Sequence, residues 1–167
     1  IERRLRGHSD PRPILTPLGL LGVQICYDLD FEDGARRLAR RGARLLAVTN
    51  LDPVEWGAAQ HAQHSAMALA RAVETGLWTA RAASSGVSQL IDPAGRVTAS
   101  VPYAASGAAV GTVRLAESRT PYVLWGWLLV PVSLLALAAA VLEALSGLLR
   151  ERALLVYQRA PLGGERG

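Results

Sequence analysis

The sequence predicts an α/β domain followed by one transmembrane helix. Two observations lead to this prediction: a strand–helix–strand pattern within about thirty residues, and a segment of 23 residues without a charge, from Thr120 to Leu142. A strand, a helix and a second strand at this spacing indicate a right-handed βαβ unit in a parallel sheet. The charge-free segment exceeds the roughly 20 apolar residues that a helix needs to cross a bilayer.

The order of elements before the charge-free segment follows from its apolar periodicity. Residues 1–17 are charged and rich in proline, so we expect a loop. Leu18 to Tyr27 is predicted as the first strand, and Phe31 to Arg41 as an amphipathic helix that ends at Gly42. Ala43 to Thr49 is predicted as a second strand, of the near-continuous apolar type found inside parallel sheets.

The later part of the domain is predicted to hold one more helix and several short strands. Gln60 to Thr75 has helical apolar spacing, and Gly76 follows it as a stop signal. Asp92-Pro93-Ala94-Gly95 is typical of a β-turn and predicts a hairpin. The predicted strands are Leu77 to Ala82, Val87 to Ile91, Arg96 to Val101 and Gly107 to Leu115.

The composition excludes several kinds of site. The net charge is +4 and every basic residue is an arginine, but the arginines form no long basic run with interleaved aromatics, so we expect no nucleic-acid binding. Arginines on the first predicted helix and its exit are interpreted as a solvated helix face rather than a phosphate-binding patch; they are Arg36, Arg37, Arg40, Arg41 and Arg44. A single cysteine excludes an internal disulfide framework and any cysteine-based zinc site.

That cysteine, Cys26, is the first candidate for chemistry. It lies at the end of the first predicted strand and precedes acidic residues that begin a helix. A thiol beside a helix N-terminus is a plausible nucleophile, because such a position favours the thiolate. The alternative, which these residues leave open, is a small buried hydrophobe.

The segment from Thr120 to Leu142 also has the other marks of a membrane span. Tyr122, Trp125 and Trp127 cluster at its start, as in an interfacial aromatic belt, and Pro131 near its centre is tolerated in transmembrane helices. The alternative is a buried core helix. Arginines beyond the span, at 150, 152, 159 and 166, outnumber those just before it and favour a cytoplasmic C-terminus, with the folded domain facing the periplasm or exterior. We therefore divide the chain into an enzyme-like domain at 1–119, a transmembrane helix at 120–143 and a basic cytoplasmic tail at 144–167.

Several motifs occur in the order known from one enzyme family. They are Gly22 to Asp28, Gly42 to Asn50, Gln63-His64 leading into Arg71 to Gly76, Arg81 to Ser88, Ile91 to Arg96, and Thr120-Pro121-Tyr122 before the terminal apolar segment. From about Pro13 to the end of that segment, the sequence resembles the C-terminal part of apolipoprotein N-acyltransferases, in the nitrilase (carbon–nitrogen hydrolase) superfamily. The resemblance implies a partial nitrilase-like αββα sandwich before the transmembrane helix.

The resemblance also implies a mechanism. Cys26 matches the nucleophile of the superfamily's Glu-Lys-Cys constellation, while the Glu and the Lys lie upstream of the cysteine strand. Only 25 residues precede Cys26 and the chain has no lysine, so we expect the piece alone to be inactive. The implied reaction transfers an acyl chain from a phospholipid, through a Cys26 thioester, to the diacylglyceryl cysteine at the N-terminus of an apolipoprotein in the inner membrane. No cofactor or metal is implied.

Two other interpretations remain open for the whole protein. The first is a membrane-tethered amidase or nitrilase of the same superfamily, which the cysteine and the fold fit equally well. The second is a degenerate membrane protein without catalysis.

Three residues near the nucleophile are expected to support the site. Asp28 stands where these acyltransferases usually carry Glu, and it either positions the base or the incoming amine or caps the following helix. Tyr27 adjoins the nucleophile, and Asn50 falls near the family's Asn-Asp loop. The loop departs from the family pattern at Leu51 and in its spacing to Trp56-Gly57. Ser84 and Ser85 also depart from the pattern, because the family commonly has Asn or Thr at these positions.

Two further pairs are expected to have no catalytic role. Glu74 and Arg81 match family positions, and we interpret them as an internal ion pair or hydrogen-bonded set. His61 and His64 share a helix face, but no third metal ligand is apparent in the sequence, so a metal site is not predicted.

Overall fold

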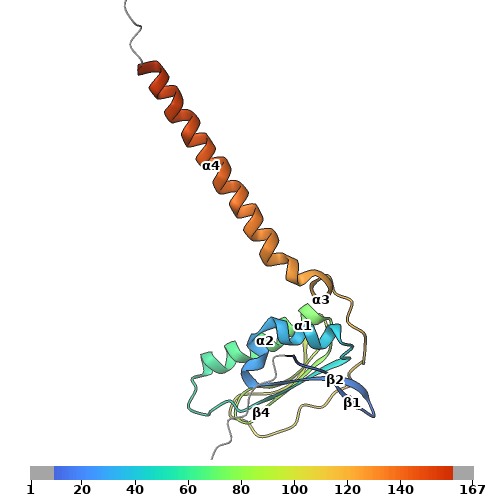
Figure 1. The fold of residues 1–167 in the computed structure, drawn as a ribbon. Coiled ribbons are helices and arrows are strands. Elements are labelled where there is room, and N and C mark those ends of the chain that lie inside the picture. The colour runs from blue at the N-terminus through green and yellow to red at the C-terminus, as the bar shows by residue number, and fades with distance from the viewer. Residues whose placement is uncertain (1–9, 160–167) are drawn as a thin grey trace, which may run out of the picture. The chain divides into compact units, whose positions relative to one another are not determined.

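The structure, a computed structural model, describes residues 10–159 and separates into two units that meet after Gly126. The first unit is an α/β domain, and the second contains one long helix (Figure 1). Parts of two predicted segments, residues 1–9 of the leading loop and residues 160–167 of the tail with Arg166, lie outside the described residues.

The domain is built on a six-stranded mixed sheet in the order β1-β2-β3-β4-β5-β6. The central pairs β2–β3 and β3–β4 are parallel, and the remaining pairs are antiparallel. The strands are β1 (Ile14–Thr16), β2 (Gly19–Ile25), β3 (Leu45–Asn50), β4 (Thr79–Ala83), β5 (Ser88–Ile91) and β6 (Val97–Val101). The predicted βαβ unit is confirmed, because β2 and β3 are parallel and a helix connects them.

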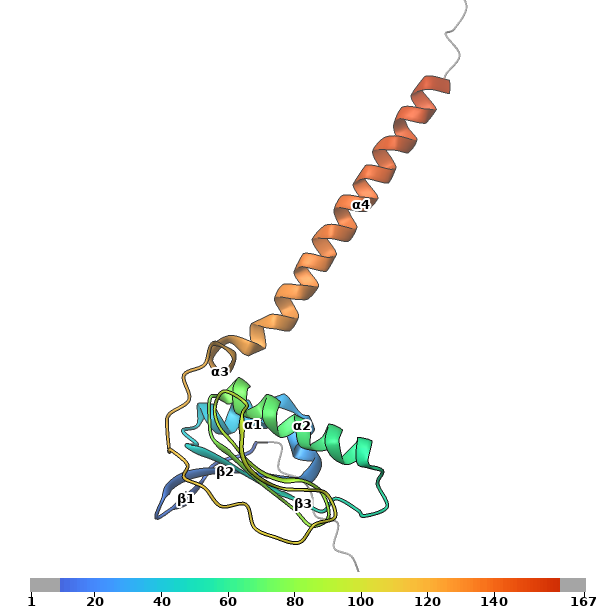
Figure 2. The same ribbon diagram turned by 180° about the vertical axis from the view of Figure 1, so that it is seen from behind.

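Helices α1 (Glu32–Arg40) and α2 (Ala58–Thr75) cover one face of this sheet (Figure 2). Each follows a parallel strand and turns its apolar stripe towards the sheet. Glycines with positive φ end them, Gly42 at +88° just beyond α1 and Gly76 at +64° as the C-cap of α2. The short helix α3 (Pro121–Trp125) buries Val123 against the same layer. The two core clusters are Ala35, Leu38, Ala39, Ala43, Leu46, Leu77 and Val123, and Leu29, Val48, Ala68, Ala72 and Ile91.

The opposite face of the sheet is apolar and only half-covered. Side chains on alternate positions of β2, β3 and β4, such as Val23, Ala47 and Ala80, are partly exposed, whereas their neighbours on the helix face are buried. Residues 107–109 lie over the β4–β5 part of this face. One helical layer on one sheet is thus described, which corresponds to half of an αββα sandwich.

Two predicted elements differ in the structure. Part of the leading loop is strand β1, which forms a tight hairpin with β2; the hydroxyl of Thr16 donates to the Gly19 carbonyl (2.8 Å). Because the segment is rich in proline, so short a strand could not be predicted from its composition. Gly107 to Leu115, predicted as a last strand, is irregular, because the chain turns after β6 at Ala104 (φ +58°) and crosses the sheet instead of pairing with its edge.

The second unit consists of helix α4 (Leu129–Arg159), which a 3₁₀ turn over Gly126–Leu128 precedes. The helical segment Pro121–Arg150 is long and apolar enough to span a membrane by length and composition, with a mean hydropathy of 2.3 in its most apolar window and none of that window buried. This exposure argues against the alternative of a core helix. Helix α4 continues past Glu143. The predicted boundary at 143 therefore marks the point where charged residues begin and not the end of the helix.

Candidate active site

Cys26 lies at the carboxyl end of β2, where the strand gives way to a 3₁₀ turn, η1 (Cys26–Asp30). The strand therefore ends at Ile25 and not at Tyr27 as predicted. Cys26 has a φ of +53°, a left-handed conformation that residues with a side chain adopt at some cost. The thiol is half-buried, so it combines a strained backbone with access from outside. Cys26 is therefore not a fully buried core residue.

The carboxylate of Asp28 stabilises this turn. Its Oδ2 accepts a hydrogen bond from the backbone N–H of Ile25 at 3.0 Å, across the residue that carries the thiol. The side-chain amide of Gln24 donates to the Asp28 carbonyl at 2.9 Å from the other side. Of the two roles expected for Asp28, this geometry supports capping, and it caps η1 rather than the next helix.

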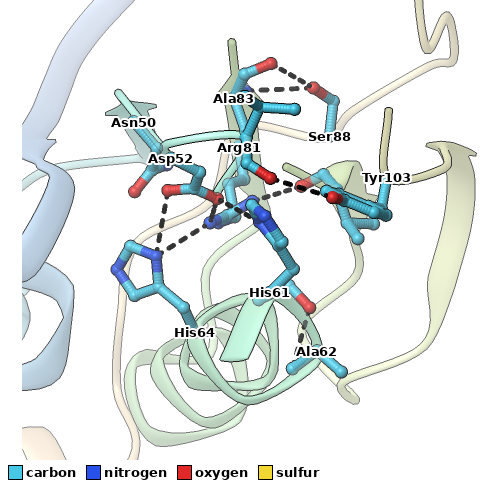
Figure 3. A network of polar contacts seen from close by, with 12 residues as sticks. Asn50, Asp52, His61, Ala62, His64, Arg81, Ala83, Ser88 and Tyr103 are labelled. Carbon is cyan, nitrogen blue, oxygen red and sulfur yellow. Dashed lines mark hydrogen bonds and ion pairs between the residues drawn. The ribbon is translucent and has the colours of Figure 1, made fainter. Parts of the chain in front are cut away.

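The loop after β3 supplies a buried carboxylate, Asp52, which joins two other elements (Figure 3). Its Oδ2 accepts a hydrogen bond from Nη2 of Arg81 on β4 at 2.7 Å, and both side chains are fully buried. Its Oδ1 lies 3.0 Å from Nδ1 of His64 on α2, and the same Arg81 nitrogen is 3.2 Å from that ring nitrogen. Arg81 also donates to the Val87 carbonyl.

This network lies directly beside the thiol. The Sγ of Cys26, a carboxylate oxygen of Asp52 and a ring nitrogen of His64 are all within 4.8 Å of one another. Cys26 and Asp52 both follow parallel strands, and the carboxyl ends of parallel strands meet at one edge of a sheet. Helix α2 then brings His64 back to the same edge. The fold therefore assembles an acid, an imidazole and a thiol from three separate segments.

Gly86 provides the space that Asp52 occupies. A Cβ atom at position 86 would lie 2.0 Å from Oδ2 of Asp52, far inside van der Waals contact. Gly86 itself is buried, in the tight loop between β4 and β5. The tight loop around Gly86 thus packs against the network.

Asn50 lies next to the network but is bonded elsewhere. It is the last residue of β3 and is buried, and its side-chain amide makes a long hydrogen bond of 3.5 Å to the Ala82 carbonyl (Figure 3). Its backbone carbonyl accepts from the N–H of Ser84 at 3.1 Å. These bonds tie β3 to β4, which is a structural contribution to the edge that carries the site.

A pocket of about 270 Å³ opens beside His64. Aromatic rings surround this histidine: the ring of Tyr27 lies 5.2 Å from it and that of Trp56 lies 5.7 Å from it, centroid to centroid. Tyr27 is half-exposed, so its ring forms part of the pocket wall and not of the core. The lining residues are Tyr27, Asp30, Trp56, Gln60, Gln63, His64 and Met67. The wall thus combines aromatic rings and one methionine with a carboxylate, two side-chain amides and an imidazole.

The carbon–nitrogen hydrolase family model matches residues 1–120. The chain belongs to this family. A carbon–nitrogen hydrolase from Helicobacter pylori G27 has the same fold, with a TM-score of 0.53 at 21% identity over 59% of this chain and 41% of that one.

Two relatives within the carbon–nitrogen hydrolase superfamily carry a more specific name. An apolipoprotein N-acyltransferase from Gloeobacter violaceus is 42% identical over 147 residues, 88% of this chain. Another, from Pseudomonas putida, is 37% identical over 139 residues, 82% of this chain. The chain spans 27% of the length of each of these relatives.

The predicted structural roles of Glu74 and Arg81 are correct in kind, but the two do not pair with each other. Arg81 pairs with Asp52, and Glu74 pairs with Arg71 on its own helix at 3.0 Å. Burial raises the pKa of the Glu74 carboxyl, and the charge of Arg71 opposes this rise.

The helix-face arginines are largely paired with acids, so no open phosphate-binding patch forms from them. Arg36 and Arg37 pair with Asp33, Arg41 with Asp10, and Arg44 with Glu117. The predicted solvated face holds for Arg37, Arg40, Arg41 and Arg44, whereas Arg36 is mostly covered, with 15% of its side chain exposed.

Sequence reasoning missed the grouping of His64 with Cys26. It paired His64 with His61 and found no third ligand, whereas the structure places Cys26 and Asp52 next to His64. His61 is not a member of that group: its Nδ1 lies 3.9 Å from Oδ2 of Asp52, and its ring packs on Tyr103 with centroids 4.2 Å apart. A metal at the Cys26 group would meet the Arg81 cation, which already occupies Asp52, so these residues fit a cation poorly. In the sequence, the Gln63-His64 motif was the signal that could have indicated a place for His64 in the site.

Proposed function

We propose that the whole protein to which this chain belongs is an apolipoprotein N-acyltransferase with Cys26 as its nucleophile. The single observation that supports this most is the combination of a strained, half-buried thiol at the sheet edge with 42% identity to a protein of that name. The apolar segment Pro121–Arg150 supports a membrane location for the reaction. We further propose the inner membrane, with the domain on the periplasmic or exterior side and the C-terminus in the cytoplasm.

The proposed chemistry has two steps. In the first, the Cys26 thiolate attacks the ester carbonyl of a phospholipid, a C–S bond forms, and the ester C–O bond breaks to release a lysophospholipid, whose oxygen takes up a proton. In the second, the amino nitrogen of a diacylglyceryl cysteine at an apolipoprotein N-terminus attacks the thioester carbonyl and forms a C–N bond. The nitrogen loses a proton, the C–S bond breaks, and sulfur leaves with its electron pair and takes up a proton or remains a thiolate. The tetrahedral intermediates need hydrogen-bond donors close to Cys26.

The family resemblance implies a Glu and a Lys upstream of Cys26. The chain has no lysine, and the residues before Cys26 contain no Glu in the context of the family motif. Both groups belong to the upstream part of the whole protein in this proposal. We therefore expect this chain alone to turn over no substrate. This expectation concerns turnover and not the chemical reactivity of the thiol.

The test is acyl trapping on the whole protein. Incubation with a phospholipid that carries a labelled acyl chain should attach the label to the protein through a bond that hydroxylamine cleaves, as it does thioesters. Cys26→Ala should remove the label, and Arg119→Met, a change at an exposed side chain outside the site, should retain it. Label that persists in Cys26→Ala would refute the assignment of the nucleophile.

The second candidate is a carbon–nitrogen hydrolase acting on a small amide or nitrile, which the family match supports. It is distinguished in the same preparation by ammonia release. An amidase should release ammonia from a small amide with Cys26 intact and should acquire no label from phospholipid.

A further inference from the structure

Another pocket, of about 370 Å³, lies at the end of the sheet opposite to Cys26. Its wall includes Leu20 near the start of β2 and Arg44 just before β3, whereas Cys26 follows the last residue of β2. The strand from Leu20 to Cys26 is roughly 20 Å long at about 3.3 Å per residue. A ligand in this pocket is therefore not in contact with the thiol.

The pocket lies at the first turn of the candidate membrane span. Leu124 on α3 forms part of its wall, and the long apolar helical segment begins at Pro121. Helix α3 lies beside α1 and is held there by Val123, which is buried in the core cluster under α1 (Figure 2). The hydroxyl of Thr120 donates to the Glu74 carbonyl at the end of α2 and accepts from the N–H of Val123 at 3.1 Å. The domain thus fixes the pocket to the point where the apolar segment starts.

Two arginines border this pocket, although the arginines of α1 and its exit form no open patch. Arg40, the last residue of α1, is exposed and makes no ion pair or hydrogen bond in the part of the chain that the structure describes. Arg44 makes a 3.4 Å pair with Glu117, and both of these side chains are about half-exposed. Exposed pairs of this kind are weak, so an incoming anion can replace Glu117 on Arg44. The cations in the wall outnumber the carboxylate, which favours an anionic ligand.

The rest of the wall is apolar and is continuous with the candidate span. Leu20, Val123 and Leu124 contribute to it, and the side chain of Leu124 is 44% exposed. A small anion such as free phosphate would gain nothing from these side chains. A lipid with a charged headgroup matches both parts, because its phosphate can bind the arginines while its hydrocarbon follows the apolar segment into the bilayer.

We propose that this pocket binds the headgroup of an anionic phospholipid, with the phosphate on Arg40 and Arg44 and the glycerol and acyl region along Leu124. This lipid is a bound ligand and not the acyl donor, because the pocket and the thiol lie at opposite ends of β2. Its role is to hold the domain against the membrane surface at the start of the span. The proposal requires that the apolar segment lies in a bilayer, but it does not require acyl transfer.

The test is a lipid titration of the full chain in detergent micelles, with retained lipid counted by native mass spectrometry. Phosphatidylglycerol is the anionic probe and phosphatidylcholine the zwitterionic one. One phosphatidylglycerol should be retained at a lipid concentration about fivefold or more below that needed for phosphatidylcholine, since each arginine close to an anionic lipid contributes about this factor. Equal retention of the two lipids would overturn the proposal.

Substitutions locate the bound lipid. Arg40→Gln should weaken phosphatidylglycerol binding about fivefold, whereas Arg40→Lys keeps the charge and should retain most of the affinity. Arg114→Gln is the matched control, because Arg114 is also exposed and without a printed-chain partner in the described residues, but does not border this pocket. Its affinity should stay within about twofold of the wild type, since a distant exposed charge is largely screened. Equal losses in Arg40→Gln and Arg114→Gln would mean attraction to net charge alone and would overturn the proposed site.

Inorganic phosphate distinguishes the lipid from a free anion. Added at the concentration of phosphatidylglycerol that half-saturates the chain, it should leave the bound lipid in place, because it cannot use the apolar wall. Displacement of the lipid by an equal concentration of phosphate would overturn the assignment to a lipid. None of these readouts depends on Cys26, so failure of the proposed function would be seen separately, in the acyl-trapping experiment on the whole protein.

Discussion

Asp52 and Arg81 form an ion pair in which Nη2 lies 2.7 Å from Oδ2 and neither side chain is exposed. The pair joins the loop after β3 to the middle of β4, and it positions the carboxylate that holds His64. A buried pair of this kind contributes little net stability compared with an apolar pair of the same volume, but each partner depends on the other. The pair therefore contributes more to the arrangement of the site than to net folding stability.

Arg81→Met should destabilise the domain strongly, because it leaves the Asp52 carboxylate buried without its cation. We expect a loss of about 3–5 kcal/mol in the free energy of unfolding, measured by denaturant titration in micelles. Arg119→Met is the control, since Arg119 is 84% exposed in a 3.4 Å pair and should cost no more than about 1 kcal/mol. Similar losses in the two variants would contradict the importance of the buried pair.

Gly86→Ala should disturb the same carboxylate sterically. The added Cβ would lie 2.0 Å from Oδ2 of Asp52, so the loop or the carboxylate must move, at a cost of about 1–3 kcal/mol. The loss is measured by denaturant titration. Gly57→Ala, where a Cβ meets nothing within 4 Å, should leave the free energy of unfolding close to that of the wild type, and an equal loss in the two variants would contradict the steric argument.

Asp28→Ala should loosen the turn that carries Cys26. It removes the carboxylate that accepts from the Ile25 N–H at 3.0 Å, and loss of such a cap costs about 1 kcal/mol. Asp28→Asn keeps an oxygen in the same position and should recover most of the stability. If the alanine and asparagine variants unfold at the same denaturant concentration, the hydrogen bond does not stabilise the turn. The better interpretation is then the other expected role of Asp28, which is to position the base or the incoming amine.

Asp92 should make the stability of the domain depend on acid pH. Hydrogen bonds from the backbone of Arg96, then from its side chain and from the Ala94 backbone, hold the pKa of the Asp92 carboxyl below its usual range. A carboxyl with a lowered folded pKa stabilises the protein above its unfolded pKa of about 3.9, and this contribution is lost as the pH falls below that value.

The measurement for Asp92 is a series of denaturant midpoints for wild type and Asp92→Asn as the pH is lowered. The wild type should be the more stable protein at neutral pH, and the gap between the two should close below about pH 4. A gap that stays constant over this range would mean that the turn does not depend on the charge of Asp92.

The sequence was sufficient for most elements because their signals are local. The apolar runs of β2 and β3, the helical spacing before Gly76 and the Asp92–Gly95 turn are all present in the structure, the last with the expected hydrogen bond from the Gly95 N–H to the Asp92 carbonyl at 2.9 Å. The errors fell where local signals are weak. Strand β1 has three residues, and the segment after β6 has strand-like composition but crosses the sheet instead of pairing with its edge.

By itself, the sequence determined that Cys26 lies at the end of a strand, that this strand belongs to a parallel βαβ unit, and that a long apolar helix follows the domain. These properties depend on residues that are neighbours in the chain or that repeat at a helix or strand period. Only the tertiary structure decided that Asp52, His64 and Arg81 meet beside the thiol. These residues lie on a loop, a helix and a strand, and what brings them together is the common edge at which parallel strands end, a long-range relationship that no periodicity records.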